Sequence, residues 1–232
     1  SSLSNVKMPE SLSKIESSVF AYCISLRDFT VEKNVKEIAD NAFDNCTSLQ
    51  RYFVNSENIS YRSENGILYT KDLKTLKRCP QALFSDILLL PDEVETIAPH
   101  AFDGCINIKQ FRLPKTLISI GNSAFSDCKM TSIEIADAVT SIGNMTFWGC
   151  NELQTFAFPD GIKKISGSIL YSCDKLEYLY IPSSVEKIES SAFYGCKSLT
   201  TIDSRIVDID KLEVYYLASY HEYTPFTNVC DT

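Results

Sequence analysis

Apolar and polar positions recur at a fixed spacing along most of this chain. Four segments share one apolar pattern, with a cysteine at the same place in each: Val35–Leu49, Val94–Ile108, Val139–Leu153 and Val185–Leu199. The steps between successive cysteines of this frame are 23, 59, 23, 22, 23 and 23 residues, for Cys23, Cys46, Cys105, Cys128, Cys150, Cys173 and Cys196. A fixed period of about 20 to 50 residues is typical of a solenoid, in which each repeat packs only on its neighbours.

The first half of each repeat reads as a short strand that a proline ends. Its pattern is L-x-x-[IVL]-x-[IVLF]-P, with copies that start at Leu3, Ile108, Leu153 and Leu176. The last four positions alternate, which indicates a half-buried strand, and proline cannot donate to a sheet ladder. The first copy begins almost at Ser1. Because terminal repeats normally need a polar cap, we expect more protein or a cap before that residue.

The second half of each repeat contains V-x-x-I, then a small residue and Phe, then Cys three residues after the Phe. Phe and Cys at i, i+3 would share one face of a helical turn, too short to be stable unless neighbouring repeats cover it. One copy has Ile169-Leu170 in place of the small residue and Phe. The step of 22 residues follows from one residue missing after Cys128, and we expect the strand at Met130–Ile135 to stay in frame.

The repeat is interrupted between about residues 55 and 92. Gly66–Tyr69 and Thr75–Cys79 flank the polar pair Lys71-Asp72 and predict a hairpin, and Ile87–Leu90 resumes the strand pattern. We therefore place the solenoid at residues 1–203, with this interruption inside it. Residues 204–232 form the C-terminal cap, where helical spacing predicts a capping helix that Pro225 stops, with an aromatic face made by Leu212, Tyr215, Tyr216, Tyr220 and Tyr223.

Seven of the nine cysteines, those of the repeat frame, are expected to be reduced rather than paired. Equivalent residues of stacked repeats point the same way from strands that lie ~4.8 Å apart. A disulfide needs facing Cβ atoms at ~3.8 Å. The seven cysteines of the repeat frame are therefore interpreted as buried free thiols that fill space as small apolar side chains.

The charge of the chain excludes some classes of partner. Lys and Arg number 22 against 30 Asp and Glu, which gives a net charge of −8. With no block of basic residues, this balance argues against nucleic acid or an anionic membrane as partner.

The densest apolar run, Ile87–Leu90, is far too short to cross a bilayer, so we expect no membrane insertion. Neither C-x-x-C nor H-x-x-x-H occurs, and we predict no metal and no cofactor.

Three further features of the sequence could mark sites. His100 lies five residues before Cys105 and could serve a thiol nucleophile, but the other frame cysteines mostly have no histidine nearby, so catalysis is not expected. Trp148, the one tryptophan, is expected on the rim of its turn, with partial packing favoured over binding. Sequons occur at Asn45, Asn58 and Asn144, and they matter only in a eukaryotic secretory setting.

These features together resemble the BspA-like leucine-rich repeat family. The resemblance rests on the repeat V-x-x-I-x-x-x-A-F-x-x-C-x-x-L-x-x-[IL]-x-[IL]-P, on SENGILYTKD at Ser63–Asp72, and on the ending Tyr215 to Val229. It implies an α/β fold: a right-handed leucine-rich-repeat solenoid of the horseshoe type, with repeats of about 23 residues. It also implies a surface or secreted protein, often from host-associated bacteria or parasitic protists, whose relatives are associated with adhesion.

The family has no catalytic motif, so the resemblance implies no catalytic residue. The chain departs from the family pattern at three places, which concern local packing: Leu170 replaces Phe, the turn at Lys129 is short, and Cys79 stands where the family more often has an aromatic residue.

Alternation along the strands assigns every second side chain to an outward face. Large apolar, aromatic or Arg side chains that the core does not need indicate an interface. On this ground the candidate partner-binding residues are Arg51, Phe53, Ile87, Leu89, Arg112, Tyr178 and Tyr180. The alternative is ordinary strand propensity, since Tyr, Phe and Ile favour strands anywhere.

We therefore expect a non-enzymatic extracellular module, a monomer at the cell surface or secreted. It would bind a protein or glycan, such as a host surface or matrix protein, through the concave strand face. The alternative is a structural spacer within a larger cell-surface protein, and the third and least favoured hypothesis is a thiol enzyme.

Overall fold

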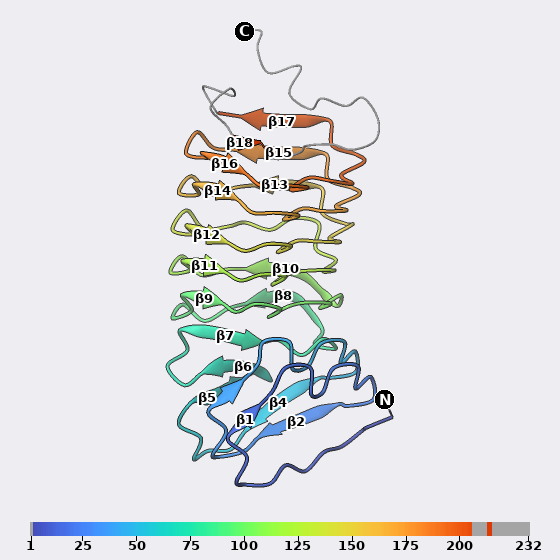
Figure 1. Cartoon of the computed structure of the whole chain (residues 1–232), viewed down its shortest axis with the longest axis vertical. Helices are drawn as coiled ribbons and strands as arrows, with labels where there is room; N and C mark the ends of the chain where they lie inside the picture. Colours follow the sequence, from blue (N-terminus) through green and yellow to red (C-terminus); the bar gives the residue numbers. More distant parts are fainter. Residues whose placement is uncertain (1, 206–212, 215–232) are drawn as a thin grey trace.

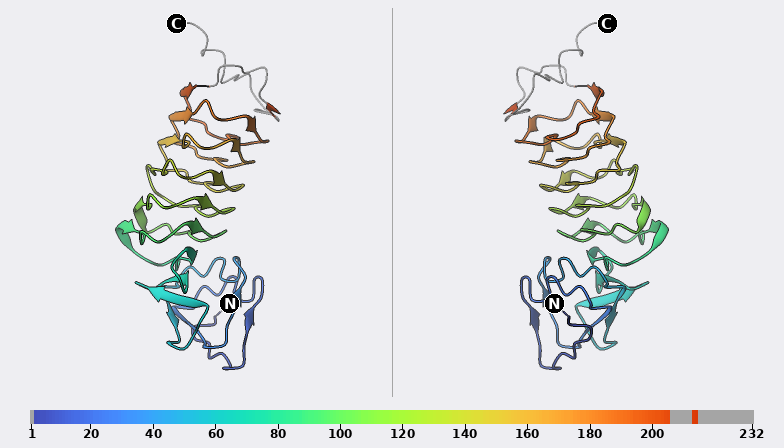
Figure 2. Two further views of the ribbon diagram at one scale, coloured as in Figure 1. Left: turned by 90° about the vertical axis from the view of Figure 1, so that its left-hand side faces the viewer. Right: turned by 90° about the vertical axis from the view of Figure 1, so that its right-hand side faces the viewer.

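The structure is a computed structural model that describes residues 2–205 and 213–214. Its strands stack in chain order along one long axis (Figure 1). The first ladder, here called the strand face, contains β2 (Asp28–Val31), β4 (Arg51–Val54), β8 (Ser85–Leu89), β10 (Ile108–Arg112), β13 (Thr155–Ala157), β15 (Tyr178–Ile181) and β17 (Thr201–Ser204). Figure 2 shows that a second ladder of shorter strands runs along another side of the stack.

The strand face confirms the predicted repeat. Its neighbouring strands are parallel, and partners are 23 residues apart, as in Asp28 opposite Arg51 and Tyr178 opposite Thr201. The ladder is not continuous, because it divides into the sheets β2–β4, β8–β10 and β13–β15–β17. The first interruption follows the insertion. The second falls at residues 130–135, which form no strand, so the prediction of an in-frame strand at Met130–Ile135 is wrong.

The second ladder was not foreseen from the sequence. It is built from the V-x-x-I segments, whose isoleucine is the buried member of each two-residue strand, as in Ile38 and Ile188. Its strands are β1 (Lys14–Ile15), β3 (Glu37–Ile38), β9 (Thr96–Ile97), β11 (Ser119–Ile120), β12 (Ser141–Ile142), β14 (Lys164–Ile165), β16 (Lys187–Ile188) and β18 (Glu213–Val214). Most repeats therefore close around their core with one strand on each ladder, and the repeats that begin at Leu3 and Met130 have a strand on the second ladder only.

The predicted helical turn between Phe and Cys is wrong, since no described residue is in a helix. In most repeats the residues two before and two after the Phe position have left-handed φ, as at His100 and Gly104 or Ser123 and Asp127. Left-handed residues end a right-handed helix. The N–H groups of the turn alternate between two kinds of partner. That of Phe102 bonds to the Ala124 carbonyl of the next repeat at 2.7 Å, whereas that of Cys105 bonds back to the Phe102 carbonyl at 3.0 Å. The described fold is therefore built of strands and turns, not α/β.

Stacked phenylalanines fill the interior. The ring centroids of Phe102 and Phe125 are 5.0 Å apart, and those of Phe125 and Phe147 are 5.5 Å apart, with the rings nearly parallel. The eight described cysteines are free thiols, and all are buried except the half-buried Cys196. The predicted burial is thus confirmed for six of the seven frame cysteines, and Cys196 departs from it.

The insertion contributes three antiparallel strands, β5 (Tyr61–Glu64), β6 (Ile67–Thr70) and β7 (Thr75–Arg78), and the last two are the predicted hairpin. They join the second ladder through β7 and β9, so that side gains strands while the strand face gains none. The core is correspondingly divided into two clusters, one reaching from Ile15 to Leu68 and the other beginning at Ile67.

Both ends of the solenoid differ from the predictions. The half-repeat at Leu3–Pro9 forms no strand, although Leu3, Val6 and Met8 pack against the first core cluster. The predicted capping helix, with Leu212, Tyr215, Tyr216, Tyr220 and Tyr223, lies outside the described residues. Within that segment only Glu213–Val214 is described, and it is a strand that pairs with β16.

None of the described residues forms a helix that could cross a membrane.

Candidate partner-binding face

The strand face exposes the side chains that alternation assigned to its outer side. In β15, Leu179 and Ile181 are fully buried, whereas Tyr178 is 36% exposed and Tyr180 is half-buried. Of the other candidates, Phe53 is 48%, Ile87 45% and Leu89 66% exposed, and Arg51 and Arg112 are exposed as well. The seven residues share one face but do not form one site. They fall into three groups, on β4, on β8–β10 and on β15.

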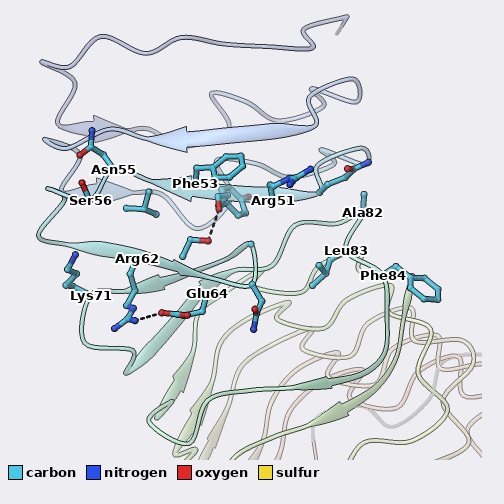
Figure 3. A pocket seen from close by; sticks show the side chains of 16 residues that line it. Arg51, Phe53, Asn55, Ser56, Arg62, Glu64, Lys71, Ala82, Leu83 and Phe84 are labelled. Carbon is cyan, nitrogen blue, oxygen red and sulfur yellow. Dashed lines mark hydrogen bonds and ion pairs between the residues drawn. The ribbon is translucent and has the colours of Figure 1, made fainter.

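The first group lies beside a hollow at the first interruption of the strand face. This first hollow has a volume of about 970 Å³ and is bounded by β4 with the residues that flank it, by β5 and its turn, and by the segment before β8. Figure 3 shows Arg51 and Phe53 on the β4 side, Arg62 and Glu64 on β5, and Phe84 near the start of β8. It exists because the insertion adds strands to the second ladder and none between β4 and β8.

Basic side chains predominate among the ionisable groups of the first hollow. Arg51 donates to the Asp28 carboxylate at 2.8 Å, and its guanidinium lies 5.6 Å from the centre of the Phe53 ring. Arg62 pairs with Glu64. Lys71 is exposed and forms no ion pair with a described residue. Three cations therefore face one carboxylate in the lining, in a chain whose net charge is −8.

The β15 group lies beside a second hollow, at the second interruption. This second hollow has a volume of about 500 Å³ and is lined by the irregular segment 132–135, by β13 and by Tyr178 and Tyr180. The Tyr178 hydroxyl donates to Asp203 at 3.2 Å, and the Tyr180 hydroxyl to Asp160 at 3.3 Å. Desolvation, followed by these carboxylates, raises the pKa of both tyrosines. Both hydroxyls therefore stay protonated at neutral pH.

The second hollow has the opposite charge to the first. Its ionisable lining residues, apart from the tyrosines, are Glu134, Asp137 and Asp160. All three are exposed, and none forms an ion pair with a described residue. The two interruptions thus give one face a basic and an acidic depression.

The remaining group lies between the two hollows on β8 and β10. Leu89 is opposite Arg112 in the parallel register, and Ile87 is opposite Gln110. Phe84, directly before β8, is 68% exposed, and Lys109 lies 5.9 Å from the centre of its ring. Sequence analysis missed Phe84, Arg62 and Lys71. The usable signal was the insertion itself, since residues beside an added segment line whatever gap that segment opens.

Trp148 lies on the rim of its turn, as expected, and is 40% exposed. Its ring centroid is 6.3 Å from that of Tyr171, which in turn stacks on Tyr194 at 4.9 Å. These three residues directly follow the Phe or Leu position of three successive repeats. Contact between the rings of successive repeats accounts for this row as packing along the rim.

Asp44, His100 and Asp103 come together across the insertion, with ligand atoms within 4.8 Å of one another. The buried guanidinium of Arg78 already donates to Asp44 at 3.0 Å. The carboxylate of Asp103 is the main cause that raises the pKa of His100, with burial acting against it, and Nδ1 of His100 lies 3.9 Å from that carboxylate. Charge compensation by Arg78 and His100 accounts for this cluster.

The candidate nucleophile Cys105 and one of the three sequons, at Asn58, have structural explanations as well. The Cys105 thiol is fully buried, with its sulfur 3.9 Å from the Pro80 carbonyl oxygen, while His100 faces the two aspartates. The Asn58 side chain is 1% exposed, and its amide donates to the carbonyls of Glu32 and Val35. An asparagine held in this way is not accessible for glycosylation.

Comparison with known proteins gives concordant results. The profile of the BspA type leucine rich repeat region, in six copies, matches residues 1–86 and 81–200. A leucine-rich repeat protein from Eubacterium ventriosum is similar with 26% identity and a TM-score of 0.80, over 84% of this chain and 53% of that one. A leucine rich cell surface protein from Faecalibacterium prausnitzii is similar with 28% identity and a TM-score of 0.76, over 85% of this chain and 59% of that one.

The pneumococcal vaccine antigen PcpA shares the fold, with 23% identity and a TM-score of 0.78, over 88% of this chain and 57% of that one. The chain thus spans a little over half the length of these three structures. No curated protein matches it.

Proposed function

This chain belongs to the BspA type leucine rich repeat family, and on that premise we propose that it is a non-enzymatic binding module that engages a protein or glycan partner through its strand face. The observation that carries the proposal is the exposure of large apolar and aromatic side chains on that face. Phe53, Ile87, Leu89 and Tyr178 have 36% to 66% of their surface accessible. The core needs none of them, because the alternate residues of each strand already fill it.

The proposed location is the cell surface or the extracellular space. The Faecalibacterium relative is described as a cell surface protein, and the fold is shared with a pneumococcal antigen. A host surface or matrix protein is the partner class that agrees with such a location. The chain acts as a monomer in this proposal.

The test measures binding of the protein to a panel of matrix proteins and glycans by surface plasmon resonance. For a partner that binds, the double variant Tyr178→Ala/Tyr180→Ala is compared with Tyr194→Ala. Tyr194 is 37% exposed, almost the same as Tyr178, but lies in the row on the turn rim. We expect the double variant to weaken binding by about tenfold or more and the control to leave it unchanged. Equal affinities for the two variants would remove Tyr178 and Tyr180 from the site.

The alternative function is a structural spacer, which the elongated, one-dimensional stack of repeats favours (Figure 1). A spacer needs length and stability and no particular outer surface. It predicts no saturable binding to any member of the panel. It also predicts that substitutions of exposed residues on the strand face change no binding property of the protein.

A further inference from the structure

We propose that the first hollow, between β4 and β8, is the docking site for an extended segment of a partner protein in which apolar side chains stand beside Asp or Glu. This inference deepens the proposed function and rests on it. It selects one part of the strand face and one class of partner. Three features of the hollow carry it: its charge, its apolar surface and its place in the ladder.

The charge of the first hollow suits a carboxylate. Lys71 is exposed and has no ion pair with a described residue, so its ammonium is available. Arg51 and Arg62 are each held by one carboxylate, from Asp28 and Glu64. A guanidinium has five N–H donors, so an arginine that is fixed by one acid can still bind a second one. The existing pairs orient the two arginines and leave the hollow cationic.

Apolar surface continues from the hollow onto the neighbouring strand. Phe53 and Phe84 line it with 48% and 68% of their surface accessible, and the half-buried Val54 and Leu83 lie in the lining with them. Beyond Phe84, β8 adds Ile87 and Leu89, both largely exposed. Contiguous exposed apolar side chains rimmed by charges mark a protein interaction site more than a solvated surface.

The place of the hollow in the ladder suits an extended peptide. The whole of β4 lines it, and neither β4 nor β8 pairs with the other across it. An extended segment points alternate side chains to opposite sides, so it can present apolar groups to Phe53 and Phe84 and carboxylates to Lys71 and Arg62. Phe53, Val54, Leu83 and Phe84 in the lining offer contacts for the apolar side chains of such a segment.

The charge of the second hollow explains why an acidic segment would bind at the first hollow and not at the second. Its ionisable lining groups, Glu134, Asp137 and Asp160, are acidic and would repel an acidic segment. Of the two hollows, the acidic segment proposed here therefore favours the first, while the β15 tyrosines can contact other parts of the same partner.

In the experiment, random heptapeptides displayed on phage are selected for binding to the immobilised protein. We expect the enriched peptides to combine Leu, Ile, Val or Phe with Asp or Glu. The affinity of the most enriched sequence, synthesised with a fluorescent label, is then measured for variants by fluorescence polarisation. Lys71→Glu/Phe84→Ala should weaken binding by about tenfold or more, whereas Lys115→Glu, at an exposed lysine outside the hollow, should leave it unchanged. Glu64→Gln should tighten binding, because it frees Arg62.

Each other outcome overturns the inference. Enriched peptides without acidic residues, or an affinity that Lys71→Glu/Phe84→Ala does not change, exclude the first hollow. If the enriched peptides instead lose affinity for the variant Tyr178→Ala/Tyr180→Ala, the proposed binding function stands, and only the assignment of the peptide site to the first hollow fails. Acidic glycans that bind the hollow while no peptide is enriched would assign it to a sugar. Absence of any peptide or glycan ligand contradicts both proposals. Thermal unfolding of every variant confirms that the fold is retained.

Discussion

The thiol sulfur of Cys46 lies 3.1 Å from the carbonyl oxygen of Phe20, one repeat earlier in the chain. The same contact, at 3.1 to 3.2 Å, recurs between Cys128 and Phe102, Cys150 and Phe125, Cys173 and Phe147, and Cys196 and Leu170. Cysteine fits this position because it is small, apolar and a weak donor. The repeat cysteines therefore act both as space-filling side chains and as links between repeats.

The first prediction concerns the reactivity of these thiols. Burial raises the pKa of Cys46 to about 11, so its reactive thiolate is scarce at pH 8. We expect the described cysteines to react slowly with Ellman's reagent in the native protein and rapidly in denaturant. Half-buried Cys196 should react first among the frame cysteines. Rapid labelling of Cys105 in native protein would contradict the prediction that the buried thiols are unreactive, and it would reopen the thiol-enzyme hypothesis.

The second prediction compares two phenylalanines of the stack. Phe125 is fully buried between Phe102 and Phe147, and Phe125→Ala should cost ~3–5 kcal/mol of unfolding free energy. Phe193 is 8% exposed, and among the described residues the ring of Phe158, 6.4 Å away, is the nearest to it. Phe193→Ala should therefore cost less. Urea denaturation of both variants measures the difference, and the reverse order would mean that the centre of the stack adapts more easily than its end.

The third prediction concerns the junction between the two core clusters. The Arg78 guanidinium donates to the Phe43 carbonyl at 3.4 Å in the first cluster and to the His100 carbonyl at 2.7 Å beside the second. Arg78→Met removes these bonds across the junction, leaves the Asp44 carboxylate without its guanidinium partner, and should destabilise by about 3–5 kcal/mol. The control is Lys77→Met, which removes the more accessible pair with Asp40 and should cost about 1 kcal/mol.

Chemical denaturation tests the third prediction, and the shape of the transition adds information. With Arg78 intact the two clusters should unfold together. In Arg78→Met we expect the transition to broaden or divide, because fewer interactions hold the clusters to each other. A variant as stable and as cooperative as the parent would show that the hairpin contacts suffice.

The fourth prediction concerns the pKa of His100. The Asp103 and Asp44 carboxylates raise it above the ordinary value of 6.5, against burial. Because the folded pKa exceeds the unfolded one, protonated His100 stabilises the fold. That contribution is complete below pH ~6.5 and disappears as the pH rises through the folded pKa. Proton NMR, with the signal assigned by His100→Gln, should give a midpoint above 6.5 that falls in Asp103→Asn. A titration midpoint at or below pH 6.5 would contradict the predicted rise in the pKa of His100.

Much of the fold could be predicted because its determinants are periodic. The apolar alternation fixed which residues of β15 face the core, and the frame of Cys150 and Cys173 fixed the stacking. The turns were misjudged because apolar spacing reports faces and not backbone conformation. Left-handed φ at residues such as Met145 and Ser168 leaves no mark in an apolar pattern. The same spacing of Phe and Cys therefore fitted a helical turn equally well.

The candidate site was less predictable, because it lies where the period fails. Alternation identified Arg51, Phe53 and Tyr178 as outward, but it could not show that hollows lie beside them. Those hollows depend on the insertion and on the irregular segment at 130–135. Arg78 was missed for the same reason: its partners in the first cluster are 34 to 38 residues away, a separation that no repeat suggests.

The two kinds of link between repeats also determine how the gene for such a chain can change in length. The thiol contacts join residues 25 or 26 apart, so duplication or loss of a whole repeat recreates them at the new boundary. The contacts of Arg78 with Phe43 and His100 have no such equivalent, and a copied repeat would not restore them. Unequal recombination can therefore lengthen or shorten the array on either side of the insertion, while the insertion itself must be inherited as a single unit.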